Sequence, residues 1–479
     1  AALYKRTAGA FPAAEAALAV VQEGARLTFE GGTVVEARAF AQLAASPQSK
    51  DMVRTLWYHK RAADRHDGLP ALAEGEVPGI ARVGLLGAGA MGAGLAFVCA
   101  RAGYDVVCKD VSEEALPRAR AHLDRLVGRH CRHLDAVARQ ALIDRVVFTL
   151  DPGPLDGADL VIEAVIEERF VKHQVIRAFE GRLRPPGPDC EGAIWASNTS
   201  ALPITELAAA SAHADRFLGL HFFSPVEAMP LVEVVRGART SDRTVARALA
   251  FTRTLRKTPI VVRDGYGFFT SRVFASYLME GAQLVVEGQD PAVVEWAARV
   301  IGMAVPPLQV FDEVTLRLGK HVFDQAEAYT GRVLPGAQAL VGRLVEDGRI
   351  GRSGGAGFYD YDAAGGRRQG IWPGLMALAG TLRQGAPAPA MGVDALGRRL
   401  LLAQCAEVAR TLDDDVLDRH RDADLGAVLG IGFAPNTGGP LSWMDRQGIW
   451  EVVEELDGLT RTCGDRFAPS RALRRMAEQ

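Results

Sequence analysis

The sequence lacks the features of membrane-spanning, disulfide-stabilised and nucleic-acid-binding proteins. It contains no run of about eighteen consecutive apolar residues, so we expect no membrane span. The formal net charge is only −3, which argues against binding to nucleic acid or to a membrane surface. The 6 cysteines include no C-x-x-C pair, so we expect no metal site and no disulfide framework, but reduced cysteines in a cytoplasmic protein.

The rest of the composition is that of an ordinary globular protein. The 479 residues predict about three domains of roughly 150 residues each. Hydrophobic residues make up 48% of the chain and charged residues 24%, which allows buried cores. No signal-peptide pattern is present, and the chain opens at Ala1 rather than at a methionine, which we interpret as the start of a piece of something longer.

A glycine-rich loop organises the first half of the chain. Gly87, Gly89 and Gly92 have the G-x-G-x-x-G spacing, between an apolar strand pattern over Ile80–Leu86 and a helix pattern over Met91–Ala102. The first glycine allows a tight turn, the second lets the backbone approach a pyrophosphate, and the third lets the helix pack close to the strand. A helix N-terminus at this point also favours phosphate.

The next strand pattern, Tyr104–Asp110, ends in an acid. Asp110 follows Gly92 by eighteen residues, where a carboxylate meets the adenosine ribose of a bound dinucleotide. Because this acid repels a 2′-phosphate, the sequence favours NAD over NADP. A tight turn that binds no phosphate is the alternative interpretation of the glycines.

The predicted domain boundaries follow from changes in pattern along the chain. Residues 1–78 contain three helix patterns and do not form an independent domain; a linker is marked by Gly68, Pro70, Gly75, Pro78 and Gly79. Residues 79–263 alternate strands and helices, which predicts an α/β, doubly wound, Rossmann-type domain. Its later strands are expected at Arg145–Leu150, Asp159–Val165, Ala193–Ser197, Phe217–Phe223, Leu231–Val235 and Pro259–Arg263.

The rest of the chain has helical patterns and an internal repeat. A long helix, a glycine turn and a P-L-x-x-x-D segment follow one another twice, ending at Pro307–Asp312 and at Pro440–Asp445. We therefore expect two related all-α domains, at residues 264–362 and 395–479, joined by a linker at residues 363–394. A long basic helix with six arginines is expected from Arg118 to Arg139. A solvated face explains that helix as well as a ligand site does.

A histidine and a glutamate lie in two apolar strand patterns that follow one another. His221 ends one strand, Glu233 lies inside the next, and the connection contains proline. Such a turn can place the two side chains next to each other, and a carboxylate beside an imidazole fixes its tautomer and favours its charged form. This arrangement suits a general base that removes a hydroxyl proton while hydride leaves for NAD. A structural histidine is the alternative.

Four motifs together resemble the 3-hydroxyacyl-CoA dehydrogenase family. They are the glycine loop, Ser197-Asn198-Thr199-Ser200, His221-Phe222-Phe223-Ser224-Pro225 with Leu231–Val235, and Gly267–Arg272. The N-terminal helices and the duplicated helical tail resemble the bacterial multifunctional fatty-acid oxidation enzymes, in which an enoyl-CoA hydratase domain precedes a linker helix and the dehydrogenase. By this resemblance, residues 1 to about 30 are the tail of a hydratase domain, an acyl-CoA thioester is the substrate, and a thiolase subunit is a partner.

The resemblance also implies roles for individual residues. His221 is the catalytic base, Glu233 is its partner, and Ser200 binds the reacting oxygen of the substrate. The residues expected to bind NAD are Gly87, Gly89, Met91, Gly92, Asp110, Glu163, Lys172 and Asn198. Arg125 and Arg129, on the basic helix, are expected to contact the CoA phosphates.

Two positions depart from the family pattern. Ser224 and Ser271 stand where many members have asparagine, and the asparagine at the second position contacts the substrate oxygen. A serine hydroxyl can donate the same hydrogen bond but is shorter. Two other functions are the alternatives. A β-hydroxyacid dehydrogenase would need a helical lysine motif that we do not find, and a non-catalytic NAD-binding protein would leave His221 and Glu233 without a role.

Overall fold

The computed structural model describes residues 2–74, 76, 79–187, 190–330, 334–362 and 366–478. These residues form two compact units. We call residues 60–268 with 416–418 the sheet unit, and residues 1–59, 269–415 and 419–479 the helical unit. The five domains predicted from the sequence remain a prediction. Gly75 and Pro78 of the first predicted linker, and residues 363–365 of the second, lie outside the described residues.

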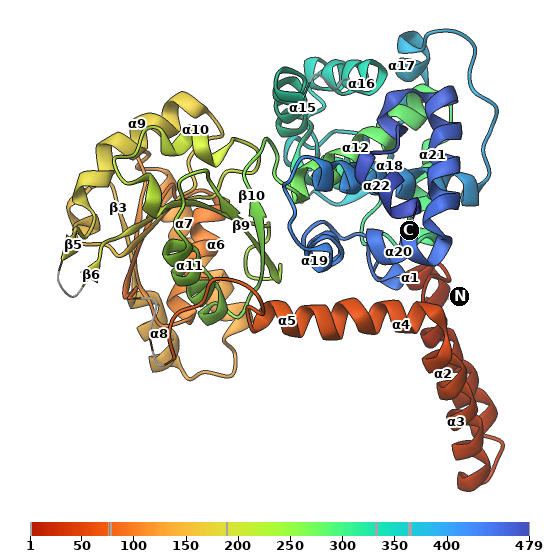
Figure 1. The fold of residues 1–479 in the computed structure, drawn as a ribbon, viewed down its shortest axis with the longest axis horizontal. Helices are drawn as coiled ribbons and strands as arrows, with labels where there is room; N and C mark the ends of the chain where they lie inside the picture. Colours follow the sequence, from red (N-terminus) through yellow and green to blue (C-terminus); the bar gives the residue numbers. More distant parts are fainter. Residues whose placement is uncertain are drawn as a thin grey trace. The chain divides into compact units, whose positions relative to one another are not determined.

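The sheet unit is an α/β domain around one eight-stranded sheet (Figure 1). The strand order is β10-β9-β8-β7-β4-β1-β2-β3, and every pair is parallel except β8 and β9. The chain therefore forms the doubly wound sheet that its alternating pattern predicts. The strands are β1 (Arg82–Leu86), β2 (Asp105–Lys109), β3 (Val146–Thr149), β4 (Leu160–Glu163), β7 (Ile194–Ser197), β8 (Phe217–Phe222), β9 (Leu231–Arg236) and β10 (Thr258–Arg263).

Helices cover both faces of this sheet (Figure 1). Buried residues of three helices share one apolar core with the strands: α6 (Ala90–Arg101), α7 (Ala115–His130) and α11 (Asp242–Thr254). The helices α9 (Arg169–Phe179) and α10 (Ile204–Ala208) follow β4 and β7, and their buried residues lie outside that core. The first segment is α5 (Lys60–Asp64), and a small hairpin joins β5 (Pro186–Gly187) and β6 (Cys190–Glu191).

The prediction of a single basic helix from Arg118 to Arg139 is wrong. Two helices, α7 and α8 (Ala136–Asp144), occupy that stretch. The Asp135 carboxylate accepts a hydrogen bond from the N–H of Ala138 at 2.7 Å, so this residue caps a new helix. An aspartate followed by a helical pattern was the available signal, and the run of arginines concealed it.

The helical unit contains the remaining helices and one small β-hairpin. Among its described residues and those of the sheet unit, no helix is both long and apolar enough to cross a membrane. The N-terminal helices are α1 (Ala2–Thr7), α2 (Pro12–Gly24), α3 (Phe29–Ala45), α4 (Pro47–Val53) and a π-helical segment, η1 (Arg54–His59). The others are α12 (Thr270–Val286), α13 (Pro291–Val300), α14 (Pro307–Val314), α15 (Leu316–Thr330), α16 (Pro335–Glu346), α17 (Leu375–Leu382), α18 (Val393–Asp413), α19 (His420–Ile431), α20 (Pro440–Gln447), α21 (Ile449–Cys463) and α22 (Arg471–Ala477), with strands β11 (Tyr359–Tyr361) and β12 (Arg368–Ile371).

The sequence repeat corresponds to two helix triplets, α12-α13-α14 and α18-α19-α20. In each triplet the third helix begins at proline, and the N–H of the following leucine donates to an acid of the second helix. Leu308 donates to Glu295 at 2.8 Å, and Leu441 donates to Asp424 at 2.7 Å. The two copies thus use the same device to satisfy a helix N-terminus.

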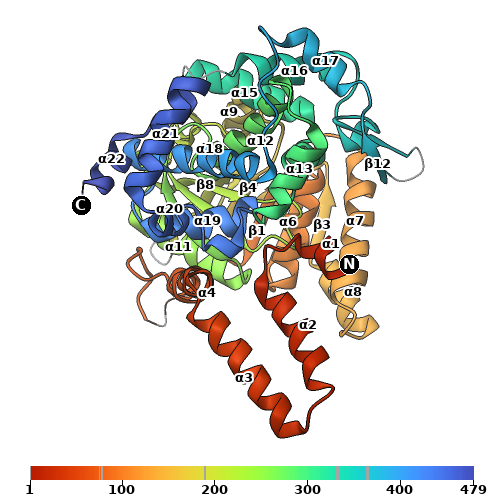
Figure 2. The ribbon, with the colours of Figure 1, turned by 90° about the vertical axis from the view of Figure 1, so that its right-hand side faces the viewer.

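Helices α2 and α3 form a hairpin that extends away from the rest of the helical unit (Figure 2). Neither helix contains a buried residue. Large apolar side chains, among them Val21, Phe29 and Phe40, are exposed. Nothing within the described residues of the helical unit covers this apolar surface.

Candidate active site

The glycine loop joins β1 to α6 at the carboxyl end of the sheet. Gly87 has φ of 107°, and a Cβ on it would lie 2.6 Å from the carbonyl oxygen of Ala164. A Cβ on Gly92 would overlap the carbonyl oxygen of Gly87. A Cβ on Gly89 would meet no atom within 4 Å. Two of the three glycines are therefore required by close packing, whereas Gly89 lies beside open space at the N-terminus of α6.

Asp110 follows β2 and holds this loop. Its Oδ2 accepts a hydrogen bond from the N–H of Ala88 at 2.6 Å. Its Oδ1 accepts from the N–H groups of Val111 and Ser112, at 2.7 and 2.9 Å. The carboxylate thus lies against the glycine loop, at the sheet edge where the sequence places it. Its contact with a ribose remains a prediction.

Glu163 and Lys172 form a buried ion pair at the end of β4. The Lys172 Nζ lies 2.8 Å from Glu163 Oε1, and the Ser197 hydroxyl donates to Glu163 Oε2 at 2.8 Å. Burial lowers the pKa of Lys172, but the carboxylates of Glu163 and Glu167 outweigh it and raise that pKa above its ordinary value. The lysine is therefore a permanent cation at neutral pH.

Glu167 connects this pair to the Ser-Asn-Thr-Ser segment, and sequence analysis missed it. Its Oε2 lies 3.3 Å from Lys172 Nζ. Its Oε1 accepts from the Thr199 hydroxyl at 2.6 Å, from the N–H of Ser200 at 2.8 Å and from the Ser200 hydroxyl at 3.2 Å. Burial raises the pKa of Glu167, but Lys172 and these donors lower it below the ordinary value. An acid just before α9, five residues from Lys172, was the available signal.

Asn198 links the ends of two neighbouring strands. Its side-chain oxygen accepts a hydrogen bond from the N–H of Phe222 at 2.9 Å, next to His221. Asn198 follows β7 and Phe222 ends β8. The two residues therefore lie at one edge of the sheet, as expected for the carboxyl ends of parallel strands.

His221 and Glu233 face each other across the antiparallel pair β8 and β9. They are in register, and His221 Nδ1 lies 2.9 Å from Glu233 Oε2. Both side chains are buried, and the ring of Phe223 lies 4.4 Å from the imidazole, centroid to centroid. Because the carboxylate holds Nδ1–H, Nε2 is the ring nitrogen that can exchange a proton with a substrate.

The connection between these two strands is anchored from two sides. Lys257 Nζ donates to the carbonyl oxygens of Val226 and Met229, each at 2.6 Å. A Cβ on Gly94 of α6 would lie 3.0 Å from Val226 Cβ, so α6 packs closely against the same connection. Burial lowers the pKa of Lys257 to about 8. Ser224 lies in this connection, before a cis proline peptide bond.

The remaining predicted site residues belong to helices. Ser271 is the second residue of α12, in the helical unit. Its neighbour Arg272 forms ion pairs with Glu407 and Asp414, both at 2.7 Å. Arg125 and Arg129 are exposed on α7. Among the described residues no group of three or more His, Cys, Asp or Glu side chains is placed to hold a metal ion.

Two family models match the chain in sequence. The model of the 3-hydroxyacyl-CoA dehydrogenase NAD-binding domain matches residues 82–265, and that of the 3-hydroxyacyl-CoA dehydrogenase C-terminal domain matches residues 267–361. The chain is also 36% identical, over 479 residues, to the fatty acid oxidation complex subunit alpha of Shewanella baltica. The match covers 99% of this chain and 66% of that protein. The chain thus spans just under two thirds of the length of that relative.

Solved structures share the fold. The M. tuberculosis FadB2 structure is 34% identical with a TM-score of 0.55, and the match covers 59% of this chain and 99% of that one. The (S)-3-hydroxybutyryl-CoA dehydrogenase PaaH1 from Ralstonia eutropha is 32% identical with a TM-score of 0.53, over 59% and 99% of the two chains. The 3-hydroxybutyryl-CoA dehydrogenase from Escherichia coli has a TM-score of 0.70 at 24% identity, over 83% and 98%, which supports the fold alone.

Proposed function

The chain belongs to the 3-hydroxyacyl-CoA dehydrogenase family as an NAD-dependent enzyme, and we propose that it oxidises (S)-3-hydroxyacyl-CoA to 3-ketoacyl-CoA with His221 as the general base. The observation that carries this proposal is the buried His221–Glu233 pair, 2.9 Å apart at the carboxyl end of the sheet. The Glu233 carboxylate orients the imidazole of His221, which can then accept the proton of the substrate hydroxyl.

The glycine loop fits a dinucleotide. Gly89 offers open space beside the N-terminus of α6, and Asp110 lies against the loop. We propose that Gly87, Gly89, Met91 and Gly92 form the phosphate side of the NAD site and that Asp110 binds the ribose. Bound NAD supplies a hydride acceptor. We assign Glu163, Lys172 and Asn198 to the nicotinamide side, where Glu167 connects them to Ser200.

The proton moves through the imidazole. His221 Nε2 takes the proton of the substrate hydroxyl, and Nδ1–H stays bonded to Glu233. The carboxylate stabilises the imidazolium that forms and keeps the ring in the productive tautomer. Burial of both side chains keeps bulk water from competing for the proton.

We propose that the Ser200 hydroxyl holds the reacting oxygen of the substrate. In the structure this hydroxyl donates to Glu167 at 3.2 Å, a long contact that a substrate oxygen can replace. The backbone N–H of Ser200 stays on Glu167 at 2.8 Å and keeps the residue in place. Ser271 is proposed as a second donor to the same oxygen, and Arg125 and Arg129 as contacts of the CoA phosphates.

Because the chain matches 66% of the Shewanella subunit, the wider role is also a proposal. We propose that the enzyme works in the oxidation of fatty acids, together with an enoyl-CoA hydratase activity and with a thiolase subunit as partner. A cytoplasmic location remains a prediction from the sequence.

Formation of NADH from NAD and (S)-3-hydroxybutyryl-CoA tests the proposal. We expect saturable turnover with this thioester and far less with its (R) isomer or with free 3-hydroxybutyrate. Turnover of the free acid at the same rate would favour the β-hydroxyacid dehydrogenase alternative. No turnover of any of the three by a folded protein that binds NAD would contradict the proposed reaction.

A further inference from the structure

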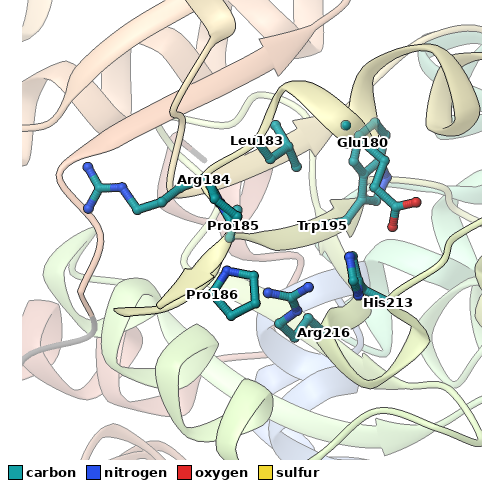
Figure 3. A pocket seen from close by; sticks show the side chains of 10 residues that line it. Glu180, Leu183, Arg184, Pro185, Pro186, Trp195, His213 and Arg216 are labelled. Atoms are coloured by element: carbon teal, nitrogen blue, oxygen red, sulfur yellow. The ribbon is translucent and has the colours of Figure 1, made fainter. Parts of the chain in front are cut away.

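A pocket lies near the amino end of strand β7, opposite the end at which the candidate active site lies (Figure 3). Trp195 is the second residue of β7, whereas Asn198 of the candidate active site follows the end of that strand. The cavity measures about 190 Å³, far more than the roughly 30 Å³ of one water molecule. In the doubly wound fold dinucleotides bind at the carboxyl ends of the strands, so this pocket is separate from the NAD site.

A buried donor without an acceptor lines this pocket. Trp195 is 2% exposed, and its indole Nε1–H has no hydrogen-bond partner among the residues that the structure describes. The ring itself is held in place, because it stacks on Phe217 with an interplanar angle of 12°. An indole nitrogen can only donate, and a buried donor without a partner costs free energy. A ligand that offers an acceptor at this point would remove that cost.

The charged groups around the pocket favour an anion. Arg216 donates through Nη1 to the carbonyl oxygen of Glu191 at 3.1 Å, and it makes no ion pair with any described residue. Glu180 is the acid of the pocket, but Ser211 and the N–H of Ala212 already donate to its two oxygens. Trp195 and Arg216 can therefore donate to a ligand, whereas the Glu180 carboxylate already accepts hydrogen bonds. A ligand of this pocket must supply the acceptor oxygens itself.

Apolar side chains form the walls of the pocket and can contact the carbon atoms of a ligand. Leu183, Pro185, Pro186 and Ala193 line the cavity together with the indole ring. We propose that this pocket binds a small organic carboxylate, whose oxygens accept hydrogen bonds from Trp195 and Arg216 and whose carbon body contacts the two prolines. This site is independent of the dehydrogenase reaction. A bare inorganic anion would leave the apolar walls without contacts.

Titration of the full chain with benzoate, observed through the ¹⁵N–¹H signals of its tryptophan indoles, tests the site. Trp195→Phe assigns the signal and keeps a ring on Phe217. We expect benzoate to shift this signal saturably, and benzamide and inorganic phosphate to have little effect. Arg216→Gln should weaken benzoate binding by about tenfold or more, since a charge-assisted hydrogen bond is lost. Arg182→Gln, which removes a nearby exposed arginine paired with Asp156, should bind as wild type does.

Three results would overturn the proposal. One is a Trp195 signal that does not respond to benzoate, or responds without saturation. Another is equal benzoate affinity in wild type and in Arg216→Gln. The third is saturable binding of phosphate with none of benzoate, which would mean that the pocket takes an inorganic ion.

Discussion

Four buried carboxylates, two from each unit, face different groups. In the sheet unit, Glu163 lies against Lys172 at 2.8 Å and Glu233 against His221 at 2.9 Å. In the helical unit, Glu295 and Asp424 accept hydrogen bonds from the first N–H groups of α14 and α20. The acids beside basic side chains lie at the carboxyl end of the sheet, whereas the other two complete helices. Burial of an acid alone therefore does not indicate catalysis.

The same contrast appears in the pKa values. Lys172 and its hydrogen-bond donors lower the pKa of Glu167, although burial opposes them. Burial raises the pKa of Glu295 to about 7 and that of Asp424 to about 6, because backbone and hydroxyl donors only partly offset it. We therefore expect the contribution of Glu167 to stability and those of Glu295 and Asp424 to change with pH in opposite directions.

Loss of His221 should have the largest effect. General-base catalysis contributes about 10²- to 10⁴-fold, so His221→Ala should lower turnover by that factor while NAD affinity stays close to that of wild type. Steady-state kinetics and NAD titration measure the two quantities. His133→Ala, at an exposed histidine of the same unit, serves as the control. Near-normal turnover of folded His221→Ala would place the base elsewhere.

Loss of Lys172 should lower stability rather than remove a proton carrier. Lys172→Met leaves Glu163 buried without its cation, which costs about 3–5 kcal/mol. We expect a clear drop in the melting temperature of the sheet unit by calorimetry. Arg169→Gln breaks an exposed ion pair with Glu206 and should cost about 1 kcal/mol or less. An equal loss of stability in both variants would show that burial of the Lys172–Glu163 pair does not increase its contribution to stability.

The helical unit should lose stability as the pH rises. The pKa of Asp424 is 3.8 in the unfolded reference and about 6 in the fold. Its proton stabilises the fold fully below about pH 4, and this stabilisation, about 3 kcal/mol at most, is lost as the pH rises through about 6. Asp424→Asn should flatten the dependence of the melting temperature on pH in that range, whereas Asp394→Asn, at an exposed acid, should not. An unchanged slope in Asp424→Asn would contradict the assignment.

Loss of Asp110 should have the smallest effect of this series. Asp110→Ala removes both the predicted ribose contact and the hydrogen bond to Ala88, so we expect NAD affinity to fall by about tenfold. Removal of the negative charge should also reduce the preference for NAD over NADP. Titration with both cofactors measures the ratio. A ratio equal to that of wild type would mean that Asp110 only holds the loop.

The sequence predicts the sheet and the His221–Glu233 pair because both follow from apolar strand patterns of neighbouring residues. The strands predicted to end at Leu86, Ser197 and Phe223 end in the structure at Leu86, Ser197 and Phe222. Two consecutive apolar strands joined by residues 223–230 favour an antiparallel pair, in which His221 and Glu233 can face each other. The sequence does not reveal Glu167 as a centre of hydrogen bonds, since its partners Thr199 and Ser200 come from another strand end. The unpaired indole of Trp195 is likewise invisible before the fold is known.

The turnover of Glu233→Gln, in wild type and in the His221→Ala background, tests the central claim most directly. If Glu233 holds Nδ1–H of His221 and stabilises the imidazolium that forms, a neutral amide at position 233 should lower kcat for oxidation while NAD affinity stays close to that of wild type. In the double variant, Glu233→Gln should cost almost no further turnover, because the carboxylate acts only through the imidazole. Normal turnover of Glu233→Gln, or an equal loss with and without His221, would contradict the account.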